Sequence, residues 1–355
     1  MNNTSKKILA IDTSCDDTSA AVVENNVVLS NIIASQTELH KPYGGVFPTV
    51  AKQAHKENID RVIALALKRA HTLPTDLAAV AVTQGPGLAP ALEVGIRAAE
   101  AFSEKYAIPL IPVNHIEGHA LSCLAQPNSK KTTPNAKAPQ LPALAIIVSG
   151  GHTQFIEVKE IGNYTILGTK LDDAAGECLD KIGRMLNLGY PAGHIIEEFA
   201  KKGNPKAITF PLPMTASNDF NMSFSGLKTF ARNTLEEKTK DGALTKQDIF
   251  DFCASSQYSV FRHIMHKLNK LLQQHDFAEV WLGGGVAANV QLRRSIRETI
   301  KPYGLQLKVP YTRRLNMDNG AMIGVAAGYK LAKHAVSLEN ASIERKPRLS
   351  IESNK

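Results

Sequence analysis

The strongest constraint on the fold is a pattern of strands and turns that occurs twice. Residues 7–11 (KILAI) read as a buried strand, and a polar turn and two more short strands follow. The same order returns over residues 141–168, as LPALAIIV, the turn SGGHT, QFIEVKE and YTILG. The two patterns begin about 135 residues apart, which predicts a duplicated domain.

Each strand pattern is followed by a segment with helical periodicity. Residues 49–71 and 247–275 have apolar side chains at helical spacing, and a short apolar strand comes after each. A last helix is expected over residues 317–335, with Asp318 at its start, where an acidic or capping residue is favoured. Because strands and helices alternate, the predicted fold class is α/β.

A chain of 355 residues is long enough for about two domains. We expect an N-terminal lobe over residues 1–127, completed by a returning C-terminal helix over 311–335. A second lobe is expected over 141–310. The Pro- and Lys-rich stretch 128–140 reads as a linker, and residues 337–355 as a polar, mobile tail.

The composition narrows the class of protein. Apolar residues make up 43% of the chain and charged residues 21%, which is typical of a globular protein. The net charge of +8 favours polyanionic partners such as RNA. The four cysteines form no CxxC pair, which argues against a zinc knuckle or a disulfide scaffold. The sequence has no signal-like segment and no long apolar run, so we expect a cytoplasmic location and no membrane partner.

Three glycine- or hydroxyl-rich turns follow apolar strands, at residues 11–19, 148–153 and 282–289. Glycine lets backbone amides approach a phosphate closely, and a helix N-terminus adds positive potential. The turns predict a nucleotide site between the two halves, although tight structural turns are the alternative. None matches GxxxxGK[ST] or GxGxxG.

The stretch NHIEGHA (114–120) contains two histidines four residues apart. On a helix, His115 and His119 share one face and can bind one metal ion, and an ordinary pair of histidines is the alternative. Glu117 is displaced by one position from the glutamate of HExxH and points to another side, so the spacing argues against a zinc protease.

The motifs NHIEGH, VSGGHTQ, DDAAGECLDKIGRMLNLGYPAG, FSGLKT, GGGVAAN and MDNGAMIG occur in this order. Together they resemble the bacterial-type TsaD family, the tRNA N6-adenosine threonylcarbamoyltransferases, over about residues 7–333. The resemblance implies an actin/Hsp70-like (ASKHA) architecture of two duplicated ribonuclease-H-like lobes with a nucleotide cleft between them. It also implies one divalent metal ion, iron with zinc as the alternative, held by His115, His119 and Asp318.

The resemblance also places substrate contacts in the second half of the chain. A carboxylate such as Asp180 suits ribose hydroxyls, and an amide such as Asn289 suits an adenosine or ribose edge. The full set of expected contacts is Ile147, Val148, Ser149, Gly150, Gly151, Asp180, Gly193 and Asn289.

The implied reaction transfers the threonylcarbamoyl group of threonylcarbamoyl-AMP to N6 of the adenosine 3′ of the anticodon, in tRNAs that read ANN codons. The products are threonylcarbamoyladenosine (t6A) and AMP. We expect catalysis by positioning and by stabilisation of charge, with the amides of Ser149–Gly151 near the developing negative charge. Asp12 is a candidate proton acceptor or orienting group, with a turn-capping role as its alternative, and His152 is a weaker candidate.

The expected macromolecular partners are tRNA, a TsaB-like paralogous subunit and a TsaE-like ATPase. Helices over residues 49–71 and 85–105 are the expected protein-docking faces. Candidate phosphate contacts are Arg293, Arg294, Arg297, Arg313 and Arg314, and a solvated helical face is the alternative for each of them.

Three other functions compete with the transferase. An ATPase or kinase of the same superfamily fits the glycine turns but leaves His115 and His119 without a role. A metalloprotease conflicts with the position of Glu117. A noncatalytic RNA-binding scaffold subunit fits the basic charge, and it would bind tRNA without using the histidines.

Overall fold

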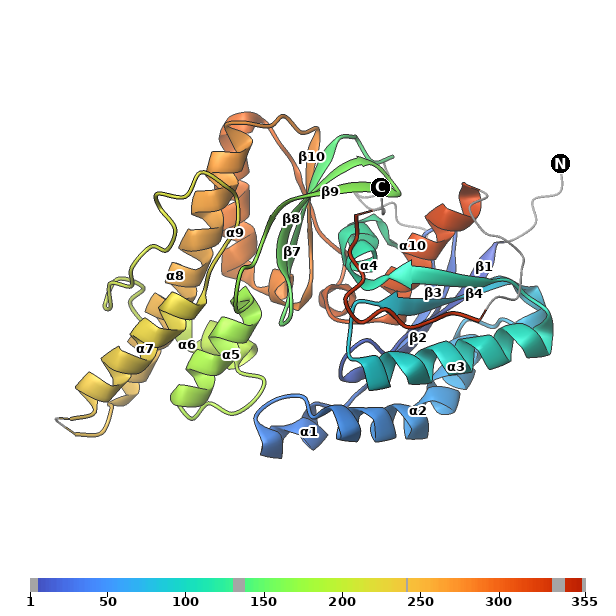
Figure 1. Cartoon of the computed structure of the whole chain (residues 1–355), viewed down its shortest axis with the longest axis horizontal. Coiled ribbons are helices and arrows are strands. Elements are labelled where there is room, and N and C mark those ends of the chain that lie inside the picture. The colour runs from blue at the N-terminus through green and yellow to red at the C-terminus, as the bar shows by residue number, and fades with distance from the viewer. Residues whose placement is uncertain (1–5, 130–137, 241, 334–341, 353–355) are drawn as a thin grey trace. The chain divides into compact units, whose positions relative to one another are not determined.

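The computed structural model describes residues 6–129, 138–240, 242–333 and 342–352 (Figure 1). The chain forms two compact units. Unit 1 contains Met1–Pro139, Glu160–Tyr164 and Lys308–Lys355, and unit 2 contains Gln140–Lys159 and Thr165–Leu307.

Unit 1 is built on a six-stranded mixed sheet in the order β5-β4-β1-β2-β3-β6. The strands β1, β2 and β3 are antiparallel neighbours, whereas β4 and β5 run parallel to β1. The bounds are β1 Lys7–Asp12, β2 Asp17–Glu24, β3 Val27–Ser35, β4 Leu77–Gly85, β5 Leu110–Asn114 and β6 Gln126–Pro127. The β2–β3 turn places both Asn25 and Asn26 at positive φ, a conformation that asparagine tolerates.

Helices cover both faces of this sheet. Alternate residues of β1, such as Leu9 and Ile11, form a core with α2 (Pro48–Arg69) and α3 (Ala89–Tyr106). On the other face, α10 (Gly320–Ala332) packs on β1 and β2, so the end of the chain completes unit 1 (Figure 1). A Cβ at Gly320 would lie 2.7 Å from the carbonyl oxygen of Ala10, so the close approach requires glycine. The remaining helices of this unit are α1 (Thr37–His40) and α4 (His115–Leu121).

Unit 2 repeats the strand order of unit 1. Its sheet runs β11-β10-β7-β8-β9, with β7 and β8 antiparallel and β10 parallel to β7. The bounds are β7 Ala143–Val148, β8 Thr153–Glu160, β9 Asn163–Thr169, β10 Glu279–Gly283 and β11 Leu307–Lys308. The predicted duplication is therefore present in the topology as well as in the sequence pattern.

The long helix α8 (Lys246–Leu272) organises the helical part of unit 2, where it packs against its neighbours α5, α6, α7 and α9. Thr245 caps α8 by accepting a hydrogen bond from the Asp248 amide. The neighbours are α5 Ala175–Met185, α6 Gly193–Ala200, α7 Ser225–Lys238 and α9 Val290–Ile300. No helix in the described part of the chain is both long and apolar enough to cross a membrane.

The expected C-terminal helix begins later than predicted, and the expected linker is described only in part. A continuous helix over residues 311–335 was expected, but the chain forms a short 3-10 turn at Arg313–Asn316 and then α10, which begins at Gly320. The expected linker 128–140 lies partly outside the described residues, since residues 130–137 are not described.

The tail after residue 337 was expected to be mobile, but residues 342–352 pack on unit 1. The amide of Lys346 donates to the carbonyl of Gln84, and the amide of Gly87 donates to the carbonyl of Pro347. Ile351 is buried. The backbone of this segment hydrogen-bonds to the loop after β4, which is why a polar sequence is nevertheless ordered here.

Candidate functional site

The two histidines of NHIEGHA lie on α4, which starts directly after β5. Asn114 ends the strand and caps the helix, because its side-chain oxygen accepts hydrogen bonds from the amides of Ile116 and Glu117. All seven residues of α4 are buried. His115 and His119 therefore lie on one face, with ring centroids 4.6 Å apart.

Close packing between α4 and α10 brings Asp318 to the histidines. A Cβ at Gly118 would lie 3.0 Å from Ile323 of α10, so this glycine lets the two helices approach. Asp318 was expected to cap the last helix, but Asn319 does so, since its side-chain oxygen accepts from the Met322 amide. The carboxylate of Asp318 is left to face the imidazoles.

The three side chains form a compact set of metal-binding atoms. Oδ1 of Asp318 lies 3.1 Å from Nε2 of His119 and 3.5 Å from Nε2 of His115. Their potential ligand atoms all lie within 4.8 Å of one another. Neither ring nitrogen of His119 makes a well-aligned hydrogen bond within the described residues, although His119 is fully buried. Buried nitrogens without hydrogen bonds beside a carboxylate fit a divalent metal ion, and the donor set of two imidazoles and one carboxylate suits iron or zinc.

The charges of this cluster are strongly coupled. Burial opposes the charged form of His115, but Asp318 and Asp12 outweigh it and raise the pKa of His115 to about 10. Burial and the neighbouring charge of His115 lower the pKa of His119, although the adjacent carboxylate of Asp318 opposes them. Burial also opposes ionisation of Asp318, yet the two histidines hold the pKa of that carboxyl well below its usual range. The carboxylate is thus ionised and a positive charge is favoured beside it.

Asp12 lies at the end of β1, next to this cluster. Its Oδ1 accepts hydrogen bonds from the Ser14 amide and the Thr83 hydroxyl, and it is 3.8 Å from Nδ1 of His115. Its Oδ2 is buried and has no hydrogen-bond partner among the described residues. Asp12 therefore combines the capping role that the sequence left open with a position beside a candidate ligand.

In unit 2, two glycine-rich turns and a helix N-terminus lie together. A Cβ at Gly176, in the first turn of α5, would lie 2.6 Å from the carbonyl oxygen of Ser149. A Cβ at Gly284, where φ is +96°, would lie 2.4 Å from the carbonyl oxygen of Val148. The turn after β7 is thus packed between the start of α5 and the turn after β10. Backbone amides and a helix N-terminus favour an anion at such a place.

The amides of this turn are not equally available. The Ser149 amide donates to the carbonyl of His152, and the Ser149 hydroxyl accepts from the His152 amide. An internal hydrogen bond therefore already uses the Ser149 amide, and its contact with developing charge stays a prediction. Gly150 and Gly151 are exposed and have open space where a side chain would lie. Ile147 and Val148 are fully buried strand residues.

Asp180 and Gly193, two of the predicted substrate contacts, lie close together. Oδ1 of Asp180 accepts hydrogen bonds from the amides of Ala192 and Gly193. The carboxylate thereby joins α5 to the start of α6. Contact of either residue with a ligand stays a prediction.

Asn289 has a clear structural role. Its side-chain oxygen accepts from the amides of Gln291 and Leu292 and so caps α9, and its amide group donates to Gln257. Arg293 turns inward, since its Nε donates to the carbonyl of Ala287. Arg294 pairs with Glu298 on the exposed face of α9. Contact of Asn289 with an adenosine or ribose edge stays a prediction.

Sequence reasoning missed Asp172, which joins two of the quoted motifs. Its carboxylate accepts hydrogen bonds from the hydroxyls of Ser223 and Ser225 and from the amides of Phe224 and Ser225. The residue next to it, Asp173, forms ion pairs with Lys181 and Lys228. The only signal in the sequence was a pair of aspartates before a helix, which does not identify distant partners.

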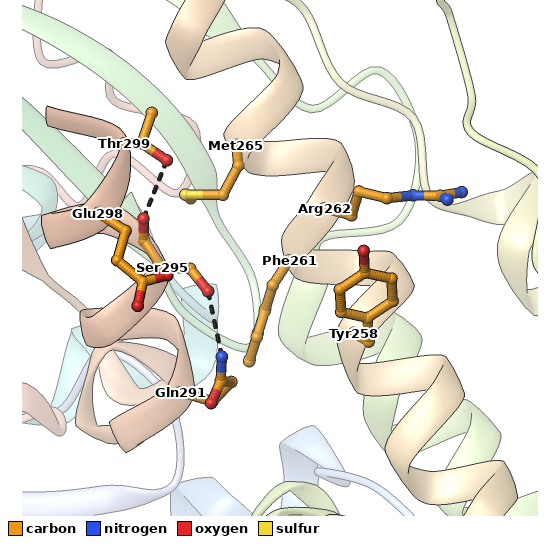
Figure 2. Close-up of a pocket in the computed structure, with 8 residues that line it drawn as sticks. All are labelled: Tyr258, Phe261, Arg262, Met265, Gln291, Ser295, Glu298 and Thr299. Carbon is orange, nitrogen blue, oxygen red and sulfur yellow. Dashed lines mark hydrogen bonds between the residues drawn. The ribbon is translucent and has the colours of Figure 1, made fainter. Parts of the chain in front are cut away.

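A pocket between α8 and α9 is separate from these residues. It has a volume of about 350 Å³, and Figure 2 shows side chains of both helices around it. Its lining residues are Tyr258, Phe261, Arg262, Met265, Gln291, Ser295, Glu298 and Thr299, none of which was predicted as a ligand contact.

Comparison with known structures supports the fold. HypF from T. kodakarensis aligns with a TM-score of 0.62 at 15% identity, covering 96% of this chain and 50% of its own. Component A of the (R)-2-hydroxyglutaryl-CoA dehydratase of Acidaminococcus fermentans aligns with a TM-score of 0.52 at 16% identity, covering 92% of this chain and 99% of its own. Both are ASKHA-type proteins, so the predicted actin/Hsp70-like class is confirmed.

Comparison with sequences supports the family. A family model described as tRNA N6-adenosine threonylcarbamoyltransferase (TsaD) matches residues 27–325. A protein of that name from Phocaeicola vulgatus is 42% identical over 324 residues, which are 91% of this chain and 93% of its own. Another from Clostridioides difficile is 44% identical over 323 residues, 90% and 92% of the two chains. The chain therefore belongs to the TsaD family of tRNA N6-adenosine threonylcarbamoyltransferases.

Proposed function

We propose which residues of this enzyme bind the metal ion, the substrate and the partners. The chain is an acyltransferase that modifies tRNA. It transfers the threonylcarbamoyl group of threonylcarbamoyl-AMP to N6 of the adenosine 3′ of the anticodon, which yields t6A and AMP. The mixed anhydride already carries AMP as its leaving group, so no activation by ATP is needed in this step. The observation that carries the proposal is the buried cluster of His115, His119 and Asp318.

This cluster is proposed to hold one divalent metal ion, with Fe²⁺ as the first candidate and Zn²⁺ as the second. When bound, the ion would supply Lewis-acid charge for oxygens of the substrate. The protein contributes the arrangement of the ligands, two of them on α4 and the third two residues before α10. Asp12 is proposed to orient His115 from the side opposite Asp318, since both carboxylates lie within 3.8 Å of that imidazole.

The residues of unit 2 are proposed to bind the adenylate part of the substrate. The exposed amides of Gly150 and Gly151, beside the start of α5, suit a phosphate or a developing oxyanion. Asp180 and Gly193 are proposed as ribose contacts. Asn289 is proposed to contact the adenosine. It would use the hydrogen-bonding capacity that remains after it caps α9 and donates to Gln257.

Surface chemistry supports the proposed partners. Exposed cations such as Arg297, Arg313 and Arg314 suit the phosphates of an ANN-decoding tRNA. At the start of α2, the exposed rings of Tyr43 and Phe47 stack with centroids 5.0 Å apart. Exposed aromatic rings are common at protein interfaces, so this end of α2 is proposed to bind a TsaB-like subunit, with a TsaE-like ATPase completing the assembly. The cytoplasm, where tRNA is modified, is the proposed place of action.

The experiment that tests this function is nucleoside mass spectrometry after a reconstituted reaction. The reaction contains this protein, its TsaB-like and TsaE-like partners, ATP, unmodified tRNA and threonylcarbamoyl-AMP. We expect t6A only when the protein is present, and none with His119→Ala. His71→Asn is the matched control, because His71 is exposed in unit 1 and asparagine tolerates its positive φ.

Each failure points to a different function. Full t6A formation by metal-free protein or by His119→Ala would exclude the metal role. Absence of t6A together with ATP turnover that needs no tRNA would favour the ATPase reading. Tight tRNA binding without any product, unchanged by His119→Ala, would favour a scaffold.

A further inference from the structure

Glu117 is the residue of NHIEGHA to which the proposed function gives no role. It lies on α4 between the two histidines, and it is only 4% exposed. A buried carboxylate without partners is strongly destabilising, so its environment indicates what it does. It does not face the histidine pair.

Both oxygens of Glu117 have a partner from another part of the chain. The hydroxyl of Tyr164 donates to Oε1 at 2.9 Å. The ammonium group of Lys330 lies 3.1 Å from Oε2 and also donates to the carbonyl of Pro112, the residue two before the α4 cap. The carboxylate therefore fastens α4 to α10 on one side and to the start of β9 on the other.

Tyr164 lies at the start of β9, in a segment that packs as part of unit 1. The strands β8 and β9 belong to the sheet of unit 2, but Glu160–Tyr164, which comprises their connecting turn and the adjoining strand ends and is called the β8–β9 turn below, packs as part of unit 1. Tyr164 is 6% exposed. Lys333 at the end of α10 holds the same turn, because its ammonium group donates to the carbonyl of Ile161 and lies 3.5 Å from Glu160.

We propose that Glu117 is a positioning residue: with Tyr164 and Lys330 it braces α4, and so sets the geometry of His115 and His119 and couples them to the β8–β9 turn. The inference deepens the proposed function, because it assumes that the two histidines bind a metal ion. The physical reason is that α4 is short. A helix of seven residues is too short to hold its own orientation, so side-chain contacts must fix it.

The test uses Tyr164→Phe and Glu117→Gln in the full-length protein, with Co²⁺ alone as the probe. Tyr164→Phe removes one hydroxyl and keeps the ring, and Glu117→Gln keeps the shape and removes the charge. Tyr329→Phe is the matched control, because the Tyr329 hydroxyl accepts its hydrogen bond from the side chain of Asn26, in the β2–β3 turn. Supporting contacts behind metal ligands typically change affinity about 10–100-fold.

We expect both test variants to weaken Co²⁺ binding about 10-fold and to shift its visible absorption bands, which report ligand geometry. Hydrogen exchange of the metal-free protein should be about 10-fold faster in residues 115–121. The control should change neither measurement. We also expect kcat to fall with little change in the KM for tRNA. The rate is counted per folded molecule, because a loss of folded protein also lowers the apparent kcat and leaves KM unchanged.

Two results separate this inference from the proposed function. If the test variants matched the wild type in Co²⁺ affinity, Co²⁺ spectrum and exchange of α4, the brace would be refuted, even if they melted at a lower temperature. If wild-type protein bound no Co²⁺ while the variants still exchanged faster in α4, the metal proposal would fail and the brace would stand as a support of the helix alone.

Discussion

Asp172 offers the sharpest test of how unit 2 is held together. One carboxylate accepts four hydrogen bonds, at 2.5 Å and 2.6 Å from the hydroxyls of Ser223 and Ser225, and at 2.8 Å and 3.3 Å from the amides of Phe224 and Ser225. The two amides lie at the N-terminus of α7, where backbone donors have no partner within the helix. Asp172→Ala removes all four acceptor contacts at once.

The expected change in the free energy of unfolding follows from these contacts. A hydrogen bond to a charged group contributes about 1.5–3 kcal/mol, so four independent bonds would give about 6–12 kcal/mol. The bonds share one carboxylate, and its half-buried donors regain water, so their effects do not add. We therefore expect Asp172→Ala to lower the free energy of unfolding by about 3 kcal/mol. Asp172→Asn should cost about half as much, because its carbonyl can still accept two of the bonds.

Trp281 makes the assay simple. It is the one tryptophan of the sequence, it is fully buried in β10, and it reports on unit 2 alone. In urea, with a slope of about 2 kcal/mol/M, a loss of 3 kcal/mol moves the fluorescence midpoint by about 1.5 M. Asp276→Ala is the control, because Asp276 is an exposed aspartate of the same unit. A loss below about 1 kcal/mol, or one equal to the control, would refute the reasoning.

The pH dependence gives a second check on Asp172. Partial burial raises the pKa of this carboxyl, but the hydrogen bonds from Ser223, Ser225 and Phe224 outweigh it and hold the pKa below its usual value. A group with a lowered folded pKa stabilises the protein above its unfolded pKa of about 3.9, and this stability is lost as the pH falls through the folded pKa. The difference between the wild type and Asp172→Asn should thus be constant from pH 5 to 7 and shrink below about pH 4.

Four other outcomes are expected. Burial, together with Lys267 and His266, lowers the pKa of His263 to about 4. The stability that its neutral form provides is therefore present above about pH 6.5 and is lost as the pH falls toward 4. Unfolding followed by Trp281 fluorescence should show a loss on the order of 2 kcal/mol over this range, and His263→Gln should abolish that loss. Gly284→Ala forces a side chain to positive φ against the carbonyl of Val148 and should cost at least about 2 kcal/mol, whereas Gly285→Ala, with open space around its Cβ, should be nearly neutral in the same assay. Deletion of residues 342–355 removes the buried Ile351 and the backbone hydrogen bonds of this segment to the loop after β4, and it should lower the Tm of unit 1 by about 3–6 °C in calorimetry; an unchanged Tm would mean that the segment only rests on the surface. Asp318→Asn should leave the Tm of metal-free protein within a few degrees but remove stoichiometric metal from the purified protein, as elemental analysis would show; retained metal would contradict the ligand assignment.

The sequence by itself determined the duplicated α/β architecture and the existence of its main elements. The strands before SGGHT and the helices near residues 49–71 and 247–275 were predicted within a few residues, because period and length are local properties. The spacing of His115 and His119 likewise fixed their shared helical face. The addition of Asp318 came from the family resemblance, since no local spacing links it to residues about 200 positions earlier.

The tertiary structure decided which polar groups meet. Asn319 caps α10 and leaves Asp318 to the histidines, although both residue types are suited to capping. The partners of Glu117 and Asp172 lie about 50 residues or more away, so only the packing of α4, α10 and the β8–β9 turn, and of α5 and α7, brings these charges to their donors. Residues 342–352 of the polar tail pack on unit 1 because the loop after β4 offers them backbone hydrogen bonds. Local periodicity records which residues are buried, whereas a hydrogen bond between distant residues depends on the coordinates of both, and these exist only once the chain has folded.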